Sequence, residues 1–291
     1  MIEIMTLMTP LEFAKRYLAL DTYLFQPEPS ALPDYALPQG WKKLRVARYR
    51  LGRNTWADTL WNDVVKYLPK MVDVRVKTLE GSTENVTLTP GQAHKHFKYP
   101  FVGKGTPEQA QIAIQLVYRY HKAHSTPEQF VKQDFIGLDC NGFVGNYIQR
   151  VVKRQRWQIA NNDADPGPTT LIGDLLDFQG RANRVTDIND LKPSETYILG
   201  HCWEDGRVLD PSKTNRSSWG HVMITEPGSF AQTSDGLVIG VVEATAAGKR
   251  ELRYIPYTFR DSKNQSNGTV FTVWRGSKSD PMNVRISRLK V

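Results

Sequence analysis

Hydrophobic residues recur every three or four positions through much of the first half of the chain, a spacing that predicts amphipathic helices. Three of the predicted helices follow the same local signal: a Thr cap, Pro at the first helical position, and Glu or Gln at the third to close a capping box. They begin after Thr9, Thr106 and Thr126. A further helix is expected over residues 56–68, and a β-hairpin over residues 72–88, where valines alternate with charged residues.

The pattern changes in the last third of the chain to β-branched and aromatic runs separated by Gly, Pro, Asp and Asn, which predict strands. Helices followed by a series of strands are typical of the α+β class. We therefore expect an antiparallel sheet that packs on the helix following Cys140. The predicted strands cover residues 197–199, 221–225, 237–245, 252–259, 270–274 and 284–286.

Cys140 lies at the start of one of the amphipathic helices. Hydrophobic residues follow it at helical spacing, at Val144, Tyr147, Ile148 and Val151. At this position the unpaired backbone N–H groups and the positive end of the helix dipole favour a thiolate. A thiolate can act as a nucleophile, and the same N–H groups can hold an oxyanion. The alternative is that Cys140 is a small buried residue beside a loop.

A cysteine nucleophile needs a base, and the base needs an orienting group. His221 opens a predicted strand and follows Gly220, which lets another segment approach closely. Glu243 lies in the apolar run 238–245, where an unpaired charge is costly. We therefore predict that Glu243 bonds His221 across neighbouring strands, which fixes the imidazole tautomer and favours the imidazolium. Taken separately, His221 fits a satisfied core histidine and Glu243 a strand-end carboxylate that reaches solvent.

Two stretches resemble motifs of the NlpC/P60 family of cysteine peptidases. Residues 139–144, Asp-Cys-Asn-Gly-Phe-Val, are similar to the family's Asp-Cys-Ser-Gly-Phe/Leu-Val motif, with Asn141 in the place of the serine. Residues 220–224, Gly-His-Val-Met-Ile, are similar to its Gly/Asp-His-Val-Gly-Ile strand, and residues 191–193, Leu-Lys-Pro, resemble the turn that precedes it. The resemblance covers roughly residues 95–260.

The resemblance implies a papain-like α+β fold and a thiol amidase or endopeptidase that cleaves peptides of the bacterial cell wall, without a cofactor or metal. Cys140 would be the nucleophile, His221 the general base and then the general acid, and Glu243, at the family's variable third position, the orienting residue. The family's Tyr-x-Trp-Gly-Gly segment before the cysteine is missing, and Tyr99 is the stand-in for its oxyanion tyrosine. Asp139 is a second candidate for contact with the oxyanion or substrate.

The formal net charge is +8 and the pI about 9.4, which suits an anionic partner. The basic residues are mostly scattered and no nucleic-acid-binding motif accompanies them. The charge alone suits nucleic acid, an anionic cell-wall polymer or a membrane surface, and the missing motif argues against a specific nucleic acid. The resemblance implies a peptidoglycan-derived peptide or cell-wall polymer as partner. The two cysteines, Cys140 and Cys202, are too few for a disulfide framework or a cysteine-rich zinc site.

Charged residues and Pro10 interrupt residues 1–20, so this stretch predicts neither a signal peptide nor a membrane span. We expect a protein that stays in the cytoplasm or is exported without a classical leader. If a leader has been removed, the cell envelope is the expected location. The sequence does not predict the oligomeric state.

We expect two parts along the chain: residues 1–104 form an N-terminal region of helices and a β-hairpin, and residues 105–291 form the catalytic domain. Three interpretations of function remain open. The first is a cysteine hydrolase. The second keeps the Cys-His-Glu triad but transfers an acyl or amide group to another acceptor. The third is an inactive basic binding module on the same fold.

Overall fold

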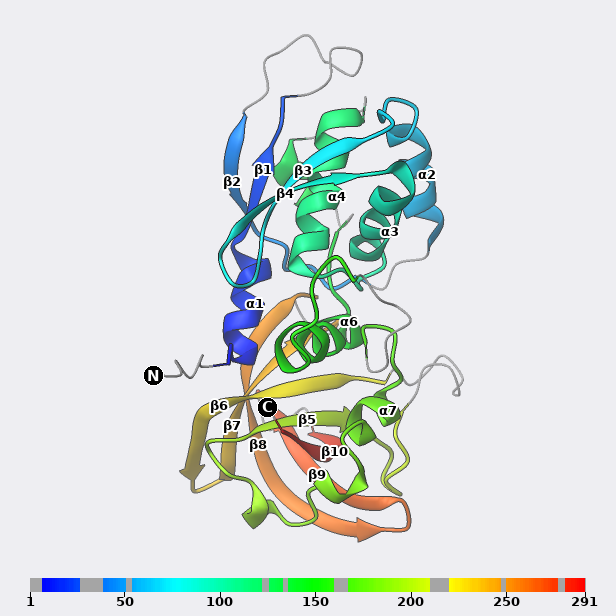
Figure 1. Ribbon diagram of the computed structural model, residues 1–291. Helices are drawn as coiled ribbons and strands as arrows, with labels where there is room; N and C mark the ends of the chain where they lie inside the picture. Colours follow the sequence, from blue (N-terminus) through cyan, green and yellow to red (C-terminus); the bar gives the residue numbers. More distant parts are fainter. Residues whose placement is uncertain are drawn as a thin grey trace.

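Six antiparallel strands close into a barrel in the C-terminal half of the computed structural model (Figure 1). Around the barrel their order is β10-β5-β6-β7-β8-β9, and the pairing of β9 with β10 closes it. Each strand predicted from the hydrophobic pattern lies in one of these six, with His221 directly ahead of β6. The strands are β5 (Thr196–His201), β6 (Val222–Thr233), β7 (Gly236–Ala244), β8 (Leu252–Gln265), β9 (Gly268–Arg275) and β10 (Pro281–Leu289).

The structure describes part of the chain, and the statements below refer to that part. Within it, none of the helices has the length and apolar character needed to span a bilayer. The described residues are 7–26, 39–50, 54–121, 126–132, 136–159, 167–209, 220–246, 250–276 and 281–290.

Alternation along the strands separates the barrel interior from a second core shared with the helices. On β7, Ile239 and Val241 belong to the interior cluster, whereas Val242 and Ala244 belong to the core under the helices. Glu243 continues the inward-pointing series and is wholly buried. The single charged residue in this apolar stretch of β7 is therefore placed at one end of the barrel interior.

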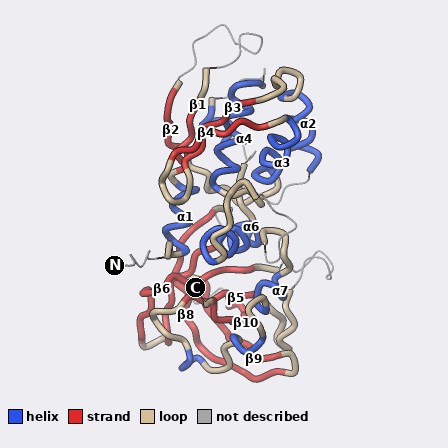
Figure 2. The backbone as a smooth tube through the Cα atoms, viewed as in Figure 1, coloured by secondary structure: helices blue, strands red, loops and turns tan. Residues whose placement is uncertain are grey.

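The N-terminal half consists of helices and two small hairpins (Figure 2). The capping boxes predicted at Thr9 and Thr106 are both present, and a third at Thr89 begins α3. The predicted hairpin over 72–88 is formed by β3 and β4. A short helix, α5, starts directly after Thr126. The elements are β1 (Leu20–Leu24), β2 (Gly40–Leu44), α2 (Asn54–Val64), β3 (Val72–Lys77), β4 (Thr83–Leu88), α3 (Pro90–Phe101), α4 (Pro107–Tyr120) and α5 (Pro127–Lys132).

Two helices lie where the N-terminal half meets the barrel (Figure 1). α1 (Pro10–Leu18) contacts β6, β7 and β8, and α6 (Cys140–Tyr147) packs on β6 and β7. Phe13 of α1 contacts the rings of Phe143 and Tyr147 of α6, with ring centroids 5.7 and 5.6 Å apart. α6 continues as a short π-helix (Ile148–Val152), and α7 (Ile172–Asp177) covers part of β5 and β10.

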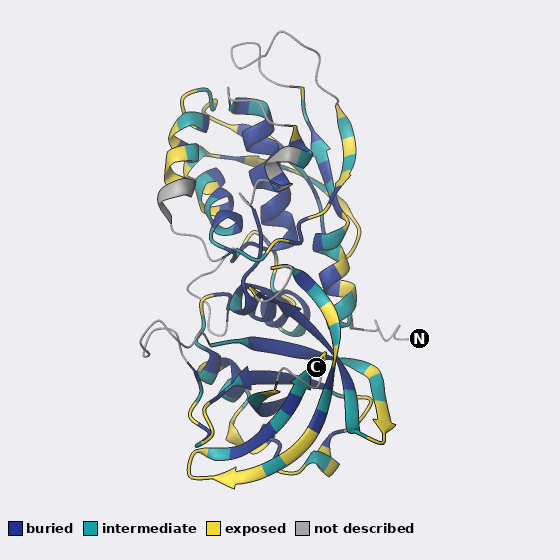
Figure 3. Cartoon of the chain, turned by 180° about the vertical axis from the view of Figure 1, so that it is seen from behind, coloured by how far each residue is buried: buried dark blue, intermediate teal, exposed yellow. Residues whose placement is uncertain are grey.

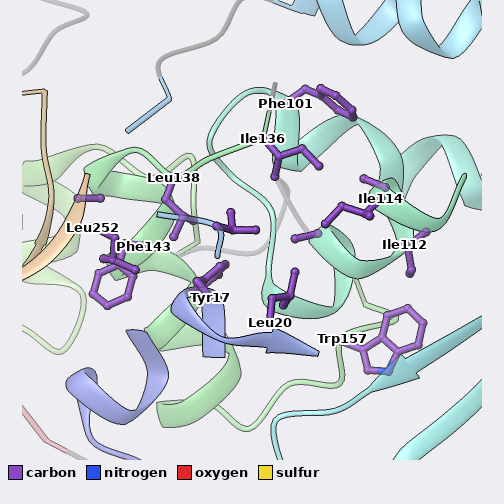
Figure 4. Packing of buried hydrophobic residues seen from close by; sticks show 14 of the residues in the cluster. Tyr17, Leu20, Phe101, Ile112, Ile114, Ile136, Leu138, Phe143, Trp157 and Leu252 are labelled. Atoms are coloured by element: carbon purple, nitrogen blue, oxygen red, sulfur yellow. The ribbon is translucent and has the colours of Figure 1, made fainter. Parts of the chain in front are cut away.

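One hydrophobic core runs from the N-terminal helices to the barrel (Figure 4). It includes Ile112 of α4, Tyr17 of α1, Phe143 of α6 and Leu252 of β8. Seen from behind, α4, α6 and the adjoining strands are dark with buried residues (Figure 3). The domain boundary after residue 104 stays a prediction, and this core contains residues from both sides of it.

Candidate active site

Cys140 is the first residue of α6, as the sequence predicts. Asp139 caps the helix, with its Oδ1 accepting a hydrogen bond from the Gly142 N–H at 2.6 Å. Gly142 lies so close to Gly103 that a Cβ on it would come 1.9 Å from the Gly103 carbonyl oxygen. The Cys140 side chain is therefore held at the helix start by a side-chain cap and by a backbone contact that only glycine permits.

Asp139 is buried and bonded to Lys104, whose Nζ lies 2.8 Å from Oδ1 and 2.7 Å from Oδ2. Burial raises the pKa of Asp139, and Lys104 and the Gly142 N–H oppose this rise. Both carboxylate oxygens are thus occupied within the protein. These contacts make Asp139 the cap of α6, and its expected contact with the oxyanion or substrate stays a prediction.

His221 and Glu243 meet as the sequence predicts. His221 Nε2 lies 2.8 Å from Glu243 Oε2, and the His221 side chain is 12% exposed. The backbone of His221 is fixed by a hydrogen bond from the His201 N–H to its carbonyl oxygen, at 2.8 Å. Because Nε2 faces the carboxylate, Nδ1 is the ring nitrogen left for Cys140, which is among the groups that raise the pKa of His221. The Cys140 thiol itself donates a hydrogen bond to Asn141 Oδ1, at 3.3 Å.

The charge state of His221 follows from these neighbours. Burial lowers its pKa, but hydrogen bonds with Cys140 and Glu243 and the attraction of their negative charges outweigh burial and raise the pKa of His221 to about 9. The imidazolium is therefore favoured at neutral pH. A protonated imidazole beside a thiol is the arrangement that stabilises a thiolate.

Glu243 is held by more groups than His221 alone. Its Oε1 accepts hydrogen bonds from Arg253 Nε at 2.8 Å and Arg275 Nη2 at 2.9 Å, and its Oε2 accepts from the Tyr257 hydroxyl at 2.8 Å. Burial raises the pKa of Glu243, but His221 and Arg275 outweigh burial and hold this pKa far below its usual range. The orienting residue of the predicted triad is thus a fixed anion.

The sequence prediction missed Tyr49, a tyrosine near enough to Cys140 for that group to act on its pKa. Burial, followed by the charges of Cys140 and Asp139, raises the pKa of Tyr49 well above its usual range, so the hydroxyl stays protonated. The Tyr49 N–H bonds the Arg250 carbonyl oxygen at 2.8 Å, and Tyr49 forms an isolated parallel bridge with Leu138. A phenol that can donate a hydrogen bond is therefore placed beside the sulfur.

Tyr99, the expected oxyanion tyrosine, lies on α3 and lines a small cavity with Asn146 and Gln149 of the α6 region. The structure gives the contact with the Cys140 thiol to Tyr49 instead. A sequence signal for Tyr49 exists: it precedes Gly52 by three positions, the spacing between the tyrosine and the first glycine in the Tyr-x-Trp-Gly-Gly segment. This signal lies about ninety residues before Cys140, too far for a search confined to the stretch just ahead of it.

The second cysteine has a different environment. Cys202 is 2% exposed, and burial raises its pKa to about 12. Both cysteines are free thiols. Among the described residues, no three His, Cys, Asp or Glu side chains form a group that could hold a metal ion. Of the two thiols, Cys140 is therefore the one with His221 and Tyr49 as neighbours.

The arrangement provides a nucleophile, a base with a fixed orienting carboxylate, and two donors for a developing negative charge: the Cys140 N–H and the Tyr49 hydroxyl. Such a site can attack a carbonyl carbon and hold the resulting oxyanion. Comparisons of the chain with protein-family models, curated proteins and solved structures found no match.

Proposed function

We propose that the protein is a cysteine hydrolase that cleaves amide bonds through Cys140, His221 and Glu243. The observation that carries the proposal is the 2.8 Å contact between His221 Nε2 and Glu243 Oε2, together with Cys140 at the first position of a helix, from where it acts on the pKa of His221. These contacts also favour an enzyme over a binding module, which would not need the three groups in hydrogen-bonding order.

The first step is acylation of Cys140. The thiolate Sγ attacks the amide carbonyl carbon and forms an Sγ–C bond, and the oxyanion accepts hydrogen bonds from the Cys140 N–H and the Tyr49 hydroxyl. His221 Nδ1 then donates its proton to the amide nitrogen, the C–N bond breaks, and the amine leaves. Glu243 keeps the ring oriented through Nε2 throughout.

The second step releases the enzyme. Neutral His221 takes a proton from a water molecule, and the hydroxide oxygen attacks the thioester carbon. The Sγ–C bond breaks, Cys140 leaves as the thiolate, and the product departs as a carboxylic acid. The positive charge of His221 is restored, and so is the resting ion pair.

The proposed substrate class is the peptide part of bacterial cell wall. Two features support it: the similarity of residues 139–144 and 220–224 to NlpC/P60 motifs, and the net charge of +8, which suits an anionic polymer.

Incubation of the protein with purified muropeptides, followed by mass spectrometry, tests the proposal. We expect a fragment pair that differs from the substrate by one added water, and loss of this activity in Cys140→Ala but not in Cys202→Ala. We also expect iodoacetamide to label Cys140 well before Cys202, because the latter is the more deeply buried thiol with a raised pKa. Equal labelling of the two thiols, or equal cleavage by both variants, would refute a Cys140 nucleophile. Transfer of the acyl group to an added amine instead of water would replace hydrolysis by group transfer.

A further inference from the structure

A basic cleft is lined by residues of α7, of the turn between β8 and β9, and of β10. Figure 1 shows where these elements lie. The cleft has a volume of about 690 Å³. A second hollow of about 580 Å³ adjoins it and shares four lining residues: Arg181, Arg184, Gly268 and Arg285. The Cys140 site is not part of either hollow.

Arg285 is the centre of this cleft. Val284 and Ile286 belong to the interior cluster of the barrel, so Arg285, between them on β10, points outward. The residue is only 9% exposed, and its guanidinium lies against Gly268, where a Cβ would come 3.4 Å from Nε and Nη2. Its hydrogen bond is a long one, from Nη1 to the Gly206 carbonyl oxygen at 3.5 Å.

The charge of Arg285 has no carboxylate within salt-bridge distance among the described residues. The contrast with Arg150 is informative, because Arg150 is equally buried and bonds the buried Glu108 at 2.7 Å. Burying an unpaired charge is costly. A buried guanidinium that lines a cleft and forms no ion pair within the described part of the protein is a site for an anion from solution.

Three further arginines surround the cleft, and the nearby carboxylates are already engaged. Asp177 bonds Arg184, with 2.7 Å between Oδ1 and Nε, and also pairs with Arg181. Arg207 pairs with Asp205, two residues away in the chain, at 2.6 Å. Burial, followed by the positive charge of Arg184, lowers the pKa of Arg285, and the charge of Asp177 opposes this only in part.

We propose that this cleft binds a phosphate ester whose ring lies against Trp203. Trp203 lines the cleft and is 42% exposed, so it offers an aromatic face to a ligand. Asn267 and Ser266 line the same cleft and provide hydrogen-bonding groups for a polar ring.

The number of guanidinium groups favours phosphate over carboxylate. A carboxylate has two oxygens and matches the fork of a single arginine, whereas a phosphate ester presents three peripheral oxygens and up to two charges to several donors at once. The volume of about 690 Å³ exceeds what an inorganic ion needs. Both a nucleoside phosphate and a sugar phosphate carry a ring beside the phosphate, and binding measurements distinguish these two classes of ligand. The proposal does not depend on the chemistry of Cys140.

Calorimetric titration of the full chain with inorganic phosphate, ADP, glucose 1-phosphate and succinate tests the proposal. We expect ADP or glucose 1-phosphate to bind at least about tenfold more tightly than inorganic phosphate and succinate, and the tighter of the two identifies the source of the ring. Arg285→Met should weaken the binding of that ligand by about tenfold or more. Trp203→Ala should remove its advantage over inorganic phosphate.

Arg156→Ala is the control, because Arg156 is an exposed arginine outside the cleft. It should leave the binding unchanged. Thermal unfolding without ligand separates binding from folding: since Arg285 has no internal countercharge, Arg285→Met should unfold at no lower temperature than the unmodified protein. Absence of binding, equal binding by Arg285→Met, or succinate binding as tight as that of the phosphate esters would overturn the proposal.

Discussion

The carboxylate of Glu243 determines the charge of the candidate site. It is wholly buried, and it faces the ring of His221 and the guanidinium groups of Arg253 and Arg275. Its negative charge contributes to the raised pKa of His221, which is about 9. The imidazolium therefore depends on a carboxylate that, in the proposed reaction, does not touch the substrate.

This dependence predicts how the protein responds to pH. The pKa of His221 is raised from 6.5 to about 9 in the folded protein, so its protonation stabilises the fold fully below pH 6.5, and this contribution is lost as the pH rises through about 9. Activity should fall over the same pH range, the alkaline limb of the pH profile, because His221 loses its proton there. Glu243→Gln should move this limb to lower pH in a profile of kcat/KM.

The same substitution should also lower the free energy of unfolding by about 3–5 kcal/mol, since two guanidinium groups lose their countercharge. Glu84→Gln, at a carboxylate on β4 that bonds Trp157 and Gln158, serves as the control and should leave the alkaline limb in place. An alkaline limb that stays at the same pH in Glu243→Gln would show that Glu243 does not set the pKa of His221.

At the scale of single residues, the sequence predicts the members of the site whose surroundings are local. The helical pattern after Cys140 makes this residue a candidate, and the cost of a charge in an apolar strand does the same for Glu243. No sequence pattern distinguishes Arg253 and Arg275, because charged residues near strand ends are ordinary on a protein surface. Only the pairing of β7 with β8, and of β8 with β9, shows that both reach one carboxylate.

At the scale of elements, the segment 48–50 is joined to the residues before α6. The Leu138 N–H bonds the Arg48 carbonyl oxygen, and the Arg50 N–H bonds the Leu138 carbonyl oxygen, both at 2.9 Å. The parallel bridge between Tyr49 and Leu138 fixes the phenol two residues from Cys140. An extended segment of the N-terminal half thus completes a site built on a helix and two strands.

We predict that Tyr49→Phe lowers kcat roughly 100-fold with little change in KM, because it removes a donor that acts on the oxyanion. Tyr99→Phe is the matched control, and its activity should equal that of the unmodified protein. Steady-state kinetics on the muropeptide substrate measure both. The opposite result, a large loss in Tyr99→Phe and none in Tyr49→Phe, would restore the assignment made from the sequence.

The helices and strands themselves are largely predictable, because their signals lie within a few residues. Thr9 and Thr106 form the capping boxes that the sequence indicates. The box at Thr89 carries the same Thr-Pro start but has Gly91 at the second helical position, a poor helix former that weakens the signal. Contacts such as the one between Tyr49 and Leu138 leave no periodic trace, so the sequence alone does not predict them.

At the scale of the molecule, α1 packs against α6, the helix that begins with Cys140. Phe13 is wholly buried and contacts Phe143 and Tyr147 on α6. Tyr147 in turn donates a hydrogen bond from its hydroxyl to the Met8 carbonyl oxygen, at 3.0 Å. The N-terminal helix therefore supports the element that carries Cys140, although the two are far apart in sequence.

Phe13→Ala should lower the free energy of unfolding by about 3–5 kcal/mol, because it leaves a cavity in a well-packed core. It should also lower kcat, since the cavity adjoins α6. Phe97→Ala, at an equally buried ring on α3 that packs on Phe101 and Trp61, should cost similar stability but leave kcat unchanged at a temperature where both variants are folded. Denaturant unfolding and kinetics measure the two effects, and equal kcat in both variants would contradict the link.

The closure of the barrel is the feature of the whole molecule that the sequence does not predict. An open antiparallel sheet and a closed barrel have the same alternation along each strand, and they differ in whether the first and last strands pair. Here β9 pairs with both β8 and β10, with register shifts in β8 near Phe259 that let the sheet curve. Arg275, at the end of β9, pairs with Tyr257 of β8, and its guanidinium reaches the carboxylate of Glu243 on β7.

The crowding around Glu243 limits how protons travel in the reaction. Its two oxygens accept from His221, Tyr257, Arg253 and Arg275, which occupies the lone pairs that a carboxylate offers. No position remains for a proton on the acid, so Nε2 of His221 keeps its hydrogen through the whole cycle. In the proposed reaction all proton transfer then passes through Nδ1, so the rate in mixed light and heavy water should vary linearly with the deuterium fraction.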